Sequence, residues 1–457
     1  MIWTNLNSVY FIGVGGIGMS ALARYFLSQG KVVAGYDRVS TSLTDKLTME
    51  GIDIHFEDQA VLIPEAFRNP DRTLVIYTPA VPEQHQQLDY FRNRGFRVIK
   101  RSVALGEVFN TRRGIGVAGT HGKTSISTML AHILHSSKLG CNAFLGGISK
   151  NTRSNLYLDR ASKIIIAEAD EYDRSFLTLF PEIAVVSSMD ADHLDIYHTK
   201  ENIKRGFESY IAQIREKGKL IHKYGLSPRI PDHVERYSYS INDREADYHT
   251  RKLTPHGLGF IFTVATPDMI IPDIKLEIPG MLNVENALAA VAVSHQLGIS
   301  PEIITRALST YQGVERRFDM QVQQEDRVYI DDYAHHPEEI RAFLSSVRTL
   351  YPHKKLTGIF QPHLYTRTRD FAEEFAKSLE MLDVLILMDI YPAREEPIPG
   401  VSASIIFDQV RLKEKVLVTR EQLMRVIKEQ DPELLVTMGA GDINQFVTPL
   451  REWIKRR

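Results

Sequence analysis

The sequence predicts an α/β protein made of three consecutive domains. The chain has 457 residues, and roughly 150 residues make one domain, so about three domains are expected. Short apolar runs alternate with helical segments along the chain, which is typical of βαβ units and parallel sheets. Glycine-bearing turns follow two of these runs, at residues 13–18 and 119–124. A chain of this length can build several hydrophobic cores without disulfides.

The first hundred residues contain the elements of one such unit. The expected strands are short apolar runs at residues 9–14, 31–36, 74–77 and 96–99. Residues 19–27 place their apolar side chains at helical spacing, between the first two of these runs. A strand, a glycine turn and a helix therefore follow one another at the start of the chain.

A second unit begins near Arg112 and Arg113. Its expected strands are compact apolar runs, typical of buried parallel strands, at residues 114–118, 163–167 and 183–187. We expect helices at residues 125–135 and 283–297. Residues 227–279 alternate apolar and polar positions instead, which predicts a β-rich insertion.

A third unit follows Gly313. Its expected strands are residues 327–330, 356–360, 384–388 and 434–438. Two helical segments, residues 338–349 and 370–379, separate them, so this unit also has the alternation of an α/β domain.

Composition narrows the classes of partner. Lys plus Arg number 55 and Asp plus Glu 57, a formal net charge of -2, which disfavours a nucleic-acid backbone or an anionic membrane as main partner. No stretch approaches about 18 consecutive apolar residues, the length of a membrane-spanning helix. The single cysteine, Cys141, excludes an intrachain disulfide. With no targeting segment visible, we expect a cytoplasmic protein with no nucleic-acid and no membrane partner.

The turn at residues 13–18 fits G-x-G-x-x-G between a strand and a helix. Glycines allow the backbone to approach phosphates closely, and the helix N-terminus favours an anion. Asp37 follows at the end of the next expected strand, where dinucleotide sites carry a ribose-binding acid. By itself the motif indicates phosphate binding, with a nicotinamide or flavin dinucleotide or a ligand-free tight turn as alternatives.

Residues 119–124 form a second phosphate loop, in which Gly122, Lys123 and Thr124 carry the chemistry. In such loops backbone amides cradle phosphates, the Lys reaches the β- and γ-phosphates, and the Thr hydroxyl contacts Mg²⁺. Val117 stands where the first Gly of the full motif belongs, but the strand before and the helix after support triphosphate binding. A dehydrogenase needs no second loop, so a nucleotide-linked substrate and a triphosphate are favoured.

Acidic and imidazole side chains follow three expected strands, at residues 168–171, 190–195 and 331–337. The carboxyl ends of parallel strands form the ligand edge of an α/β sheet. Mg²⁺ takes one or two carboxylates plus substrate phosphates, which predicts a magnesium site at residues 168–171 and a second ligand within residues 190–195. The His pair in residues 331–337 has no Cys or spaced His that would support zinc, so ribose or substrate contact is favoured there.

The chain resembles the Mur ligases of peptidoglycan synthesis over nearly its whole length. The motifs that carry the resemblance are residues 11–20, 118–124, 168–171, 192–193, 283, 286, 316–318, 331–337, 360–363 and 365–368. It implies a Rossmann-like N-terminal domain, a central P-loop-type ATPase domain with a parallel sheet and a β-rich insertion, and a C-terminal Rossmann-like α/β domain. The expected boundaries are residues 1–106, 107–313 and 314–457.

The resemblance implies ATP-dependent amide formation between L-alanine and the lactyl carboxylate of UDP-N-acetylmuramate. The carboxylate would attack the γ-phosphate of ATP, ADP would leave, and the amine of L-alanine would attack the acyl phosphate. ATP and two Mg²⁺ ions are the implied cofactors, and the protein would be a monomer or a homodimer.

The resemblance also implies site residues. The catalytic set would be Lys123, Glu168, His193 and Arg317, and the metal ligands Thr124, Glu168 and His193. ATP would contact Gly119, Thr120, His121, Gly122, Lys123, Thr124, Ser125, Asn286, Arg317, Asp331 and Asp332. The UDP sugar would contact Gly15, Gly16, Ile17, Gly18, Asp37, Thr78, Pro79, Ala80 and His121. The amino acid would contact Tyr333, His335, His363 and Arg367.

Three positions depart from the family pattern. Leu364 stands where relatives that add alanine often carry an Arg, so Arg367 or Arg369 would have to bind the alanine carboxylate. Leu282 replaces a usual His. Several relatives have a carbamylated Lys where this chain reads residues 206–209, and we hypothesise that Glu208 supplies that negative charge directly.

Other functions stay open at this point. The recycling ligase that joins UDP-N-acetylmuramate to a ready-made tripeptide shares the motifs of the first two domains, although residues 360–370 resemble the alanine-adding segment more closely. A nicotinamide-dependent oxidoreductase would explain only residues 13–37. A non-catalytic nucleotide-binding regulator would keep the loops but need not keep Glu168 and His193.

Overall fold

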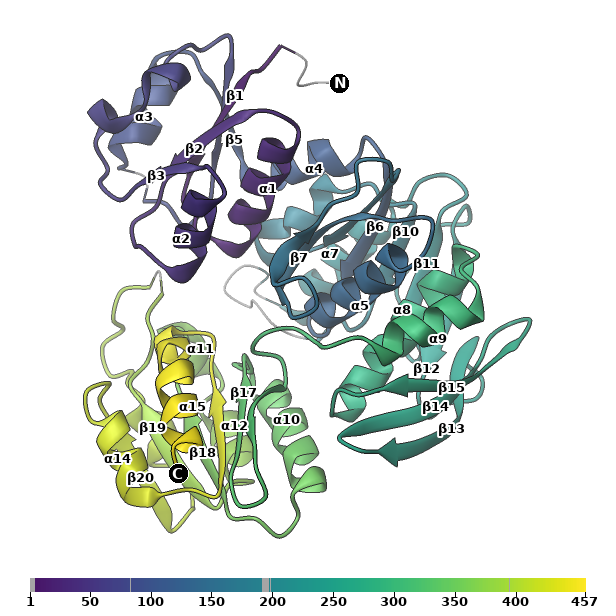
Figure 1. Ribbon diagram of the computed structural model, residues 1–457, viewed down its shortest axis with the longest axis vertical. Helices are drawn as coiled ribbons and strands as arrows, with labels where there is room; N and C mark the ends of the chain where they lie inside the picture. Colours follow the sequence, from purple (N-terminus) through teal and green to yellow (C-terminus); the bar gives the residue numbers. More distant parts are fainter. Residues whose placement is uncertain (1–4, 83, 191–196, 198, 394) are drawn as a thin grey trace. The chain divides into compact units, whose positions relative to one another are not determined.

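Figure 1 shows the computed structural model of the protein, which describes residues 5–82, 84–190, 197, 199–393 and 395–457. Within these residues the chain forms three sheets in two compact units. Unit 1 comprises Met1–Thr254, Ile261–Leu276 and Glu285–Gln312, and unit 2 comprises Pro255–Phe260, Glu277–Val284 and Gly313–Arg457. The predicted α/β class is confirmed.

The first sheet of unit 1 has the order β3-β2-β1-β4-β5 in the described part of the chain, and its neighbouring strands are parallel. Its strands are β1 (Ser8–Ile12), β2 (Val32–Tyr36), β3 (Asp53–His55), β4 (Thr73–Tyr77) and β5 (Arg97–Lys100). Its helices are α1 (Ile17–Ser28), α2 (Ser42–Met49), α3 (Gln86–Asn93) and α4 (Arg101–Phe109), with short 3-10 turns at Ala60–Leu62 and Glu65–Phe67. The strand order reverses between β1 and β4, where α/β sheets place ligands.

The second sheet of unit 1 has ten strands among the described residues, in the order β15-β14-β13-β12-β11-β10-β6-β9-β7-β8. The strands are β6 (Arg113–Ala118), β7 (Asn142–Ser149), β8 (Ser154–Tyr157), β9 (Ile164–Glu168), β10 (Ile183–Val186), β11 (Lys219–Lys223), β12 (Glu235–Ser240), β13 (Tyr248–His256), β14 (Gly259–Ala265) and β15 (Ile270–Leu276). The helices are α5 (Lys123–His135), α7 (Lys200–Ile211), α8 (Met281–Gln296) and α9 (Pro301–Ser309), with a 3-10 turn at Tyr172–Thr178.

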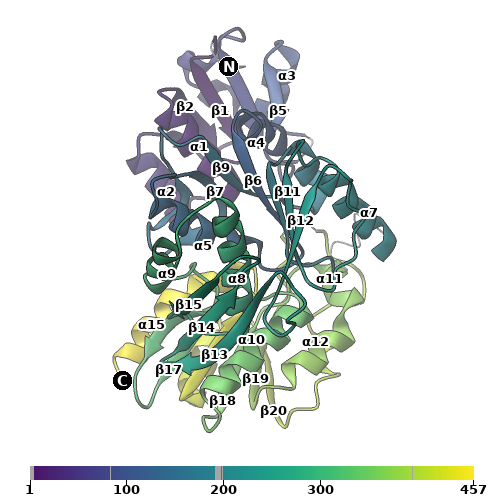
Figure 2. The same ribbon diagram turned by 90° about the vertical axis from the view of Figure 1, so that its right-hand side faces the viewer.

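The central sheet differs from the prediction in one respect. It is mixed rather than parallel, because β8 runs antiparallel to β7. The predicted β-rich insertion forms β12 to β15 and belongs to the central sheet, since β12 pairs with β11 and β13 to β15 extend the sheet further (Figure 2). Alternating side chains identified these strands, and each pairs with its neighbour in chain order. The sequence did not show that β12 pairs with β11 and so joins them to the central sheet.

The sheet of unit 2 has the order β16-β17-β21-β18-β19-β20 in the described part of the chain, with only its β16–β17 pair antiparallel among the pairings. The strands are β16 (Asp319–Gln323), β17 (Val328–Asp332), β18 (Leu356–Phe360), β19 (Val384–Met388), β20 (Glu414–Val418) and β21 (Leu434–Met438). The helices are α10 (Pro337–Leu350), α11 (Tyr365–Asp370), α12 (Ala372–Leu379), α13 (Ser404–Phe407), α14 (Leu423–Gln430) and α15 (Val447–Lys455), with a 3-10 turn at Asp442–Phe446.

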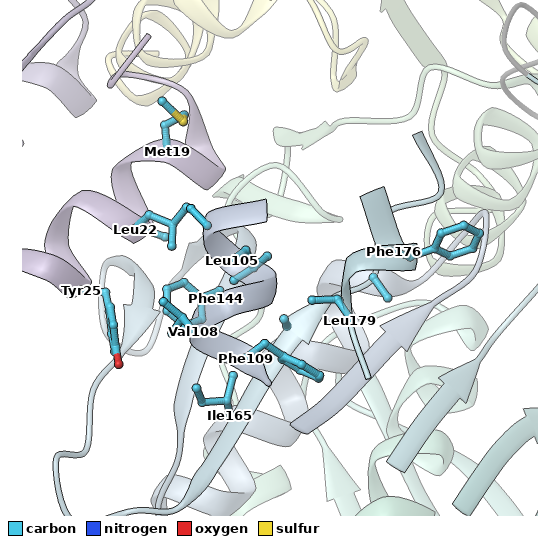
Figure 3. Close-up of a cluster of buried hydrophobic side chains, with 14 of the residues drawn as sticks. Met19, Leu22, Tyr25, Leu105, Val108, Phe109, Phe144, Ile165, Phe176 and Leu179 are labelled. Atoms are coloured by element: carbon cyan, nitrogen blue, oxygen red, sulfur yellow. The ribbon is translucent and has the colours of Figure 1, made fainter. Parts of the chain in front are cut away.

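One hydrophobic core joins the two sheets of unit 1. Met19 and Leu22 of α1 and Leu105 of α4 belong to the same buried cluster as Phe144 and Ile165 of the central sheet (Figure 3). Because burial of large apolar side chains is the main stabilising term in folding, these two sheets are held together as one body. Unit 2 has cores of its own on the two faces of its sheet.

Among the described residues, no helix has the length and apolar composition needed to cross a membrane.

Candidate active site

The second phosphate loop lies at the carboxyl edge of the central sheet. The loop connects β6 to α5, and β6 lies between β10 and β9 in the sheet. The helix begins directly after Gly122, which has a φ of 83° and no side-chain cap. The first turn of α5 contains no acidic residue, so its free amides and helix dipole favour an anion at this end. The predicted strand, turn and helix are confirmed.

Gly119 allows the loop to pass close to the neighbouring strand end. Its φ is 136°, a conformation that side chains rarely adopt. A Cβ at this position would lie 2.1 Å from Ser187 Oγ and 2.9 Å from the Ser188 amide nitrogen. Only glycine therefore fits where the loop crosses the end of β10.

Lys123 points back onto its own loop and onto a carboxylate. Its Nζ donates to Gly119 O at 2.8 Å and to the two carboxylate oxygens of Glu171 at 3.0 and 2.8 Å. Burial by itself lowers the pKa of Lys123. The nearby carboxylates, Glu171 and Asp170 first, outweigh this effect and hold the pKa above its ordinary value. Lys123 is thus a fixed positive charge at the phosphate loop.

Glu168 lies at the end of β9, beside the loop. Thr124 Oγ1 donates to its carboxylate at 3.0 Å and Ser127 Oγ at 3.1 Å, and the Gly146 amide donates at 2.5 Å. Burial raises the pKa of Glu168 despite these donors. A cation beside the carboxylate would stabilise its ionised form.

Thr120 and His121 contact the residues that follow β10. Thr120 Oγ1 donates to Asp190 O at 3.1 Å, and His121 Nε2 lies 3.7 Å from Asp190 Oδ2. The His121 amide donates to Ser188 Oγ at 2.9 Å. Ser125 lies in the first turn of α5 and is partly exposed.

Asn286, on α8, lies beside the same loop. Its Oδ1 is 2.6 Å from the position that a Cβ on Gly122 would occupy. The resemblance implied adenine contact for Asn286, and the structure brings its amide to the loop. His193 lies outside the described residues, so its predicted role as a metal ligand stays a prediction.

Sequence reasoning missed Glu171, Ser188 and Gly146 as loop partners. Glu171 belongs to a noted acidic motif, but only the fold shows that it contacts Lys123. Gly146 carried one signal, because a glycine inside a strand often marks a close backbone approach. Ser188 carried none, since a serine after a strand is common.

Glu208, on α7, accepts a hydrogen bond from a backbone amide. Its Oε1 accepts the amide hydrogen of Arg229 at 3.1 Å. The hypothesis that Glu208 replaces a carbamylated Lys stays a prediction.

The first glycine turn links β1 to α1, as predicted. The Gly15 amide donates to Asp37 Oδ2 at 2.7 Å, so Asp37 contacts the loop itself. Gly16 precedes α1 as its N-cap, and Ile17 and Gly18 are its first residues. Thr78 follows β4, its amide donating to Ile12 O at 3.2 Å, and Pro79 and Ala80 beside it are exposed. The residues expected at the UDP-sugar site therefore lie at the carboxyl ends of β1, β2 and β4, except His121, which lies in the second phosphate loop.

In unit 2, buried carboxylates occupy the end of β17. Asp331 accepts from Arg316 Nε at 3.0 Å and from Thr437 Oγ1 at 2.6 Å, and it is fully buried. Asp332 accepts from the amides of Phe318 and Ala334, each at 2.7 Å. Burial raises the pKa of Asp331, and it raises that of Asp332 to about 6. With both oxygens already bonded inside the unit, Asp331 is better placed to order the strand end than to reach a ribose.

Two arginines stack on Tyr333 beside these carboxylates. The guanidinium carbons of Arg316 and Arg317 lie 5.2 and 5.0 Å from the centre of its ring, a cation–π distance. Arg317 Nη1 also lies 3.9 Å from Glu339 Oε1. Arg316 has a φ of 61° and donates to Gly439 O at 2.6 Å, so the turn before β16 is tied to the end of β21.

The predicted amino-acid residues follow one another as a row of rings. Tyr333 lies 5.3 Å from His335, and His335 lies 6.0 Å from His363, between ring centres. His363 continues the row onto Tyr391 at 5.8 Å. Arg367, in α11 just beyond His363, is 8% exposed.

Leu364, one of the departures, has a φ of 70° and is buried. A bulky residue in this region of φ is a genuine outlier. It immediately precedes α11, so it sets the direction in which that helix leaves the end of β18. Leu282, the other departure, is 49% exposed at the start of α8.

Comparison with known proteins agrees with this geometry. Three family models match in succession: the Mur ligase family, catalytic domain, at residues 8–113, the Mur ligase middle domain at residues 117–294, and the Mur ligase, glutamate ligase domain, at residues 316–441. Phosphate loops at the carboxyl ends of α/β sheets are typical of nucleotide-binding α/β proteins. The chain belongs to the Mur ligase family.

Relatives match the chain over nearly the whole length of both proteins. The UDP-N-acetylmuramate--L-alanine ligase of Parabacteroides distasonis is 51% identical over 449 residues, 98% of this chain and 97% of the relative. That of Phocaeicola vulgatus is 50% identical over 445 residues, 97% of each chain. The crystal structure of the Thermotoga maritima UDP-N-acetylmuramate-alanine ligase matches with a TM-score of 0.83 at 25% identity, covering 98% of this chain and 99% of that one.

Proposed function

We propose that the protein joins L-alanine to the lactyl carboxylate of UDP-N-acetylmuramate, at the expense of ATP. The observation that carries the proposal is the phosphate loop in which Lys123, Thr124 and Glu168 meet. Relatives about half identical over nearly the whole chain bear the name of that ligase. The proposed domain boundaries remain residues 1–106, 107–313 and 314–457.

The loop residues would bind and activate the triphosphate. Amides at the start of α5 hold phosphate oxygens, and Lys123 neutralises charge that develops on the transferred γ-phosphoryl group. Glu171 holds Lys123 toward the loop through both carboxylate oxygens. Asn286 would contact the adenine from beside Gly122.

Thr124 and Glu168 fit a Mg²⁺ ion. They supply a hydroxyl and a carboxylate 3.0 Å apart, and Mg²⁺ characteristically takes one or two such oxygens and completes its shell with phosphates and water. Burial, which raises the pKa of Glu168, makes a neighbouring cation favourable. When bound, the ion would neutralise phosphate charge, and His193 would help hold a second ion.

Residues of unit 2 would bind the amino acid and parts of the nucleotide. Arg317 would contact a phosphate and Asp332 the ribose, with Asp331 ordering the strand end behind it. The row Tyr333, His335 and His363, with Arg367 beyond it, offers imidazole and guanidinium groups to a small zwitterion. The amine would attack the acyl phosphate, and the intermediate would collapse to the amide and phosphate.

A coupled ADP-release assay tests the proposal. The wild-type protein should release ADP with UDP-N-acetylmuramate and L-alanine, and hardly with the tripeptide in place of L-alanine. Preference for the tripeptide would assign the recycling reaction instead.

The variant Lys123→Ala should lose product formation by at least about a hundredfold while its circular dichroism is kept, because one preorganised charge at a transition state is worth roughly 10²–10³ in rate. Lys163→Ala is the matched control, since Lys163 is an exposed lysine of the same unit, and it should keep full activity. Full activity of Lys123→Ala would overturn the proposal.

A further inference from the structure

Arg101 is a cation that the proposed substrate site has not yet used. It is the first residue of α4 and directly follows β5. The strand β5 pairs in parallel with β4, which pairs with β1. Arg101 therefore lies at the carboxyl edge of the first sheet, the edge from which the glycine turn also emerges.

The side chain of Arg101 lies against the start of α1. A Cβ on Gly18 would be 3.1 Å from Arg101 Nη1, 3.2 Å from its Cδ and 3.5 Å from its Cζ. Gly18 is the second residue of the helix, among the amides that have no intrahelical acceptor. The absence of a side chain at Gly18 is what lets the guanidinium approach these amides.

The positive charge gathered there has no negative partner within the chain's described part. Among the described residues, no carboxylate lies within ion-pair distance of Arg101, and its guanidinium donates to no acceptor. The first turn of α1 has no acidic residue, and no side chain caps its amides. Asp37, the carboxylate that contacts the glycine turn, accepts a hydrogen bond from the Gly15 amide.

We propose that Arg101 binds the pyrophosphate of the nucleotide-linked substrate, together with the free amides at the start of α1. The inference rests on the proposed function, because it takes a nucleoside diphosphate sugar as the ligand of the first glycine turn. A guanidinium and helix amides side by side match the geometry of phosphate oxygens, to which Arg donates in pairs. The missing side chain at Gly18 leaves room for the Arg101 guanidinium as well as for the phosphate.

Measuring the binding of two simple ligands tests the contact between Arg101 and the pyrophosphate. Titration calorimetry with UDP and with uridine compares a ligand that has the pyrophosphate with one that lacks it. Arg101→Met keeps an apolar stem over α1 but removes the charge, and it should weaken UDP binding by about tenfold to a hundredfold, the usual worth of a charged hydrogen bond. Uridine binding should be unchanged.

Further variants separate binding from packing. Arg101→Lys should restore part of the UDP affinity, because it restores the charge without the fork of donors. Gly18→Ala should weaken UDP binding in the same direction, since its methyl group would displace the guanidinium by a few tenths of an ångström. Arg97→Met is the matched control, because Arg97 lies on β5, the strand that leads to Arg101, and is paired with Glu107 at 2.6 Å; it should bind UDP as the wild type does.

The outcomes distinguish the residue from the function. If Arg101→Met binds UDP and uridine as tightly as the wild type, the role of Arg101 is refuted while the ligase reaction stands. If it loses affinity for both ligands equally, Arg101 only supports the fold, and the inference fails. If the wild-type protein itself binds no UDP, the proposed function fails first.

Discussion

Asp332 makes the stability of unit 2 depend on pH. Burial raises the pKa of its carboxyl to about 6, from an ordinary value of about 3.9. Between these values the folded state holds a proton that the unfolded state has released. The contribution of Asp332 to the free energy of unfolding is therefore fully present below about pH 4. It is lost as the pH rises towards 6, which lowers that free energy by up to about 3 kcal/mol.

The substitution Asp332→Asn should remove this decline, because an amide does not titrate. The free energy of unfolding, measured by denaturant at a series of pH values, should fall from pH 4 to pH 7 by about 3 kcal/mol more in the wild type than in the variant. Asp326→Asn, at an exposed residue between β16 and β17, should leave the wild-type profile unchanged. Parallel profiles for the wild type and Asp332→Asn would contradict the prediction.

Some residues of the candidate site could be predicted from short sequence motifs, whereas others come together only through the fold. Lys123 and Thr124 could be identified from the sequence because the functional residues of a phosphate loop are consecutive. Glu168 could be proposed because acids at strand ends face ligands. The ion pair between Glu171 and Lys123 could not be predicted, because the fold brings together two residues that are 48 apart in the sequence. The same holds for Arg101 and Gly18, which lie on separate helices.

The phosphate loop can be tested as an element through Gly119. Ala at this position would carry a Cβ 2.1 Å from Ser187 Oγ and 2.9 Å from a backbone nitrogen, at a φ of 136°. We expect Gly119→Ala to cost about 3 kcal/mol or more of stability, because both the conformation and the contact are unfavourable. Triphosphate binding should weaken as well, since the loop would have to move away from β10.

Gly225→Ala is the control for this prediction. Gly225 also has a positive φ, 89°, but nothing lies within 4 Å of its Cβ position, so Ala should cost only about 1–2 kcal/mol. Denaturant unfolding of the two variants measures the difference. Equal losses would show that conformation alone, and not the close approach to β10, requires glycine at residue 119.

The elements themselves were predicted best where an apolar run was unbroken. The strands β1, β10 and β19 are such runs, and each was predicted within two residues of its bounds. The pair β7 and β8 was missed because Gly146 and Gly147 interrupt the pattern of the first strand. The short strand β3 was missed because Asp53 and His55 flank a single apolar residue.

At the scale of the whole molecule, the first two sheets should unfold together and unit 2 separately. At the start of the central sheet, Arg113 pairs with Glu182 at 2.7 Å and Arg215 donates to Arg112 O at 2.9 Å. The chain there is held in the fold of unit 1. A shared core and a polar contact, centred on Asn155, also connect the first sheet's α1 to the central sheet.

Asn155 tests this arrangement. It is fully buried in β8, donates to Ile17 O at 2.6 Å and to Ser20 Oγ at 2.8 Å, and accepts from Arg24 Nη1 at 2.5 Å. Asn155→Ala leaves these buried groups without their partner, which should cost unit 1 about 3 kcal/mol. Asn93→Ala, at an exposed position of α3, should cost nothing measurable.

Tryptophan fluorescence distinguishes the two units in this experiment. The chain has two tryptophans; Trp453 is in α15 of unit 2, and Trp3 lies outside the described residues, so Trp3→Phe leaves Trp453 as the sole reporter. In that background Asn155→Ala should lower the circular-dichroism transition of unit 1 without moving the Trp453 transition, since the two units have separate cores. Circular-dichroism and fluorescence transitions that coincide and shift together would instead mean that the whole chain unfolds as one cooperative body.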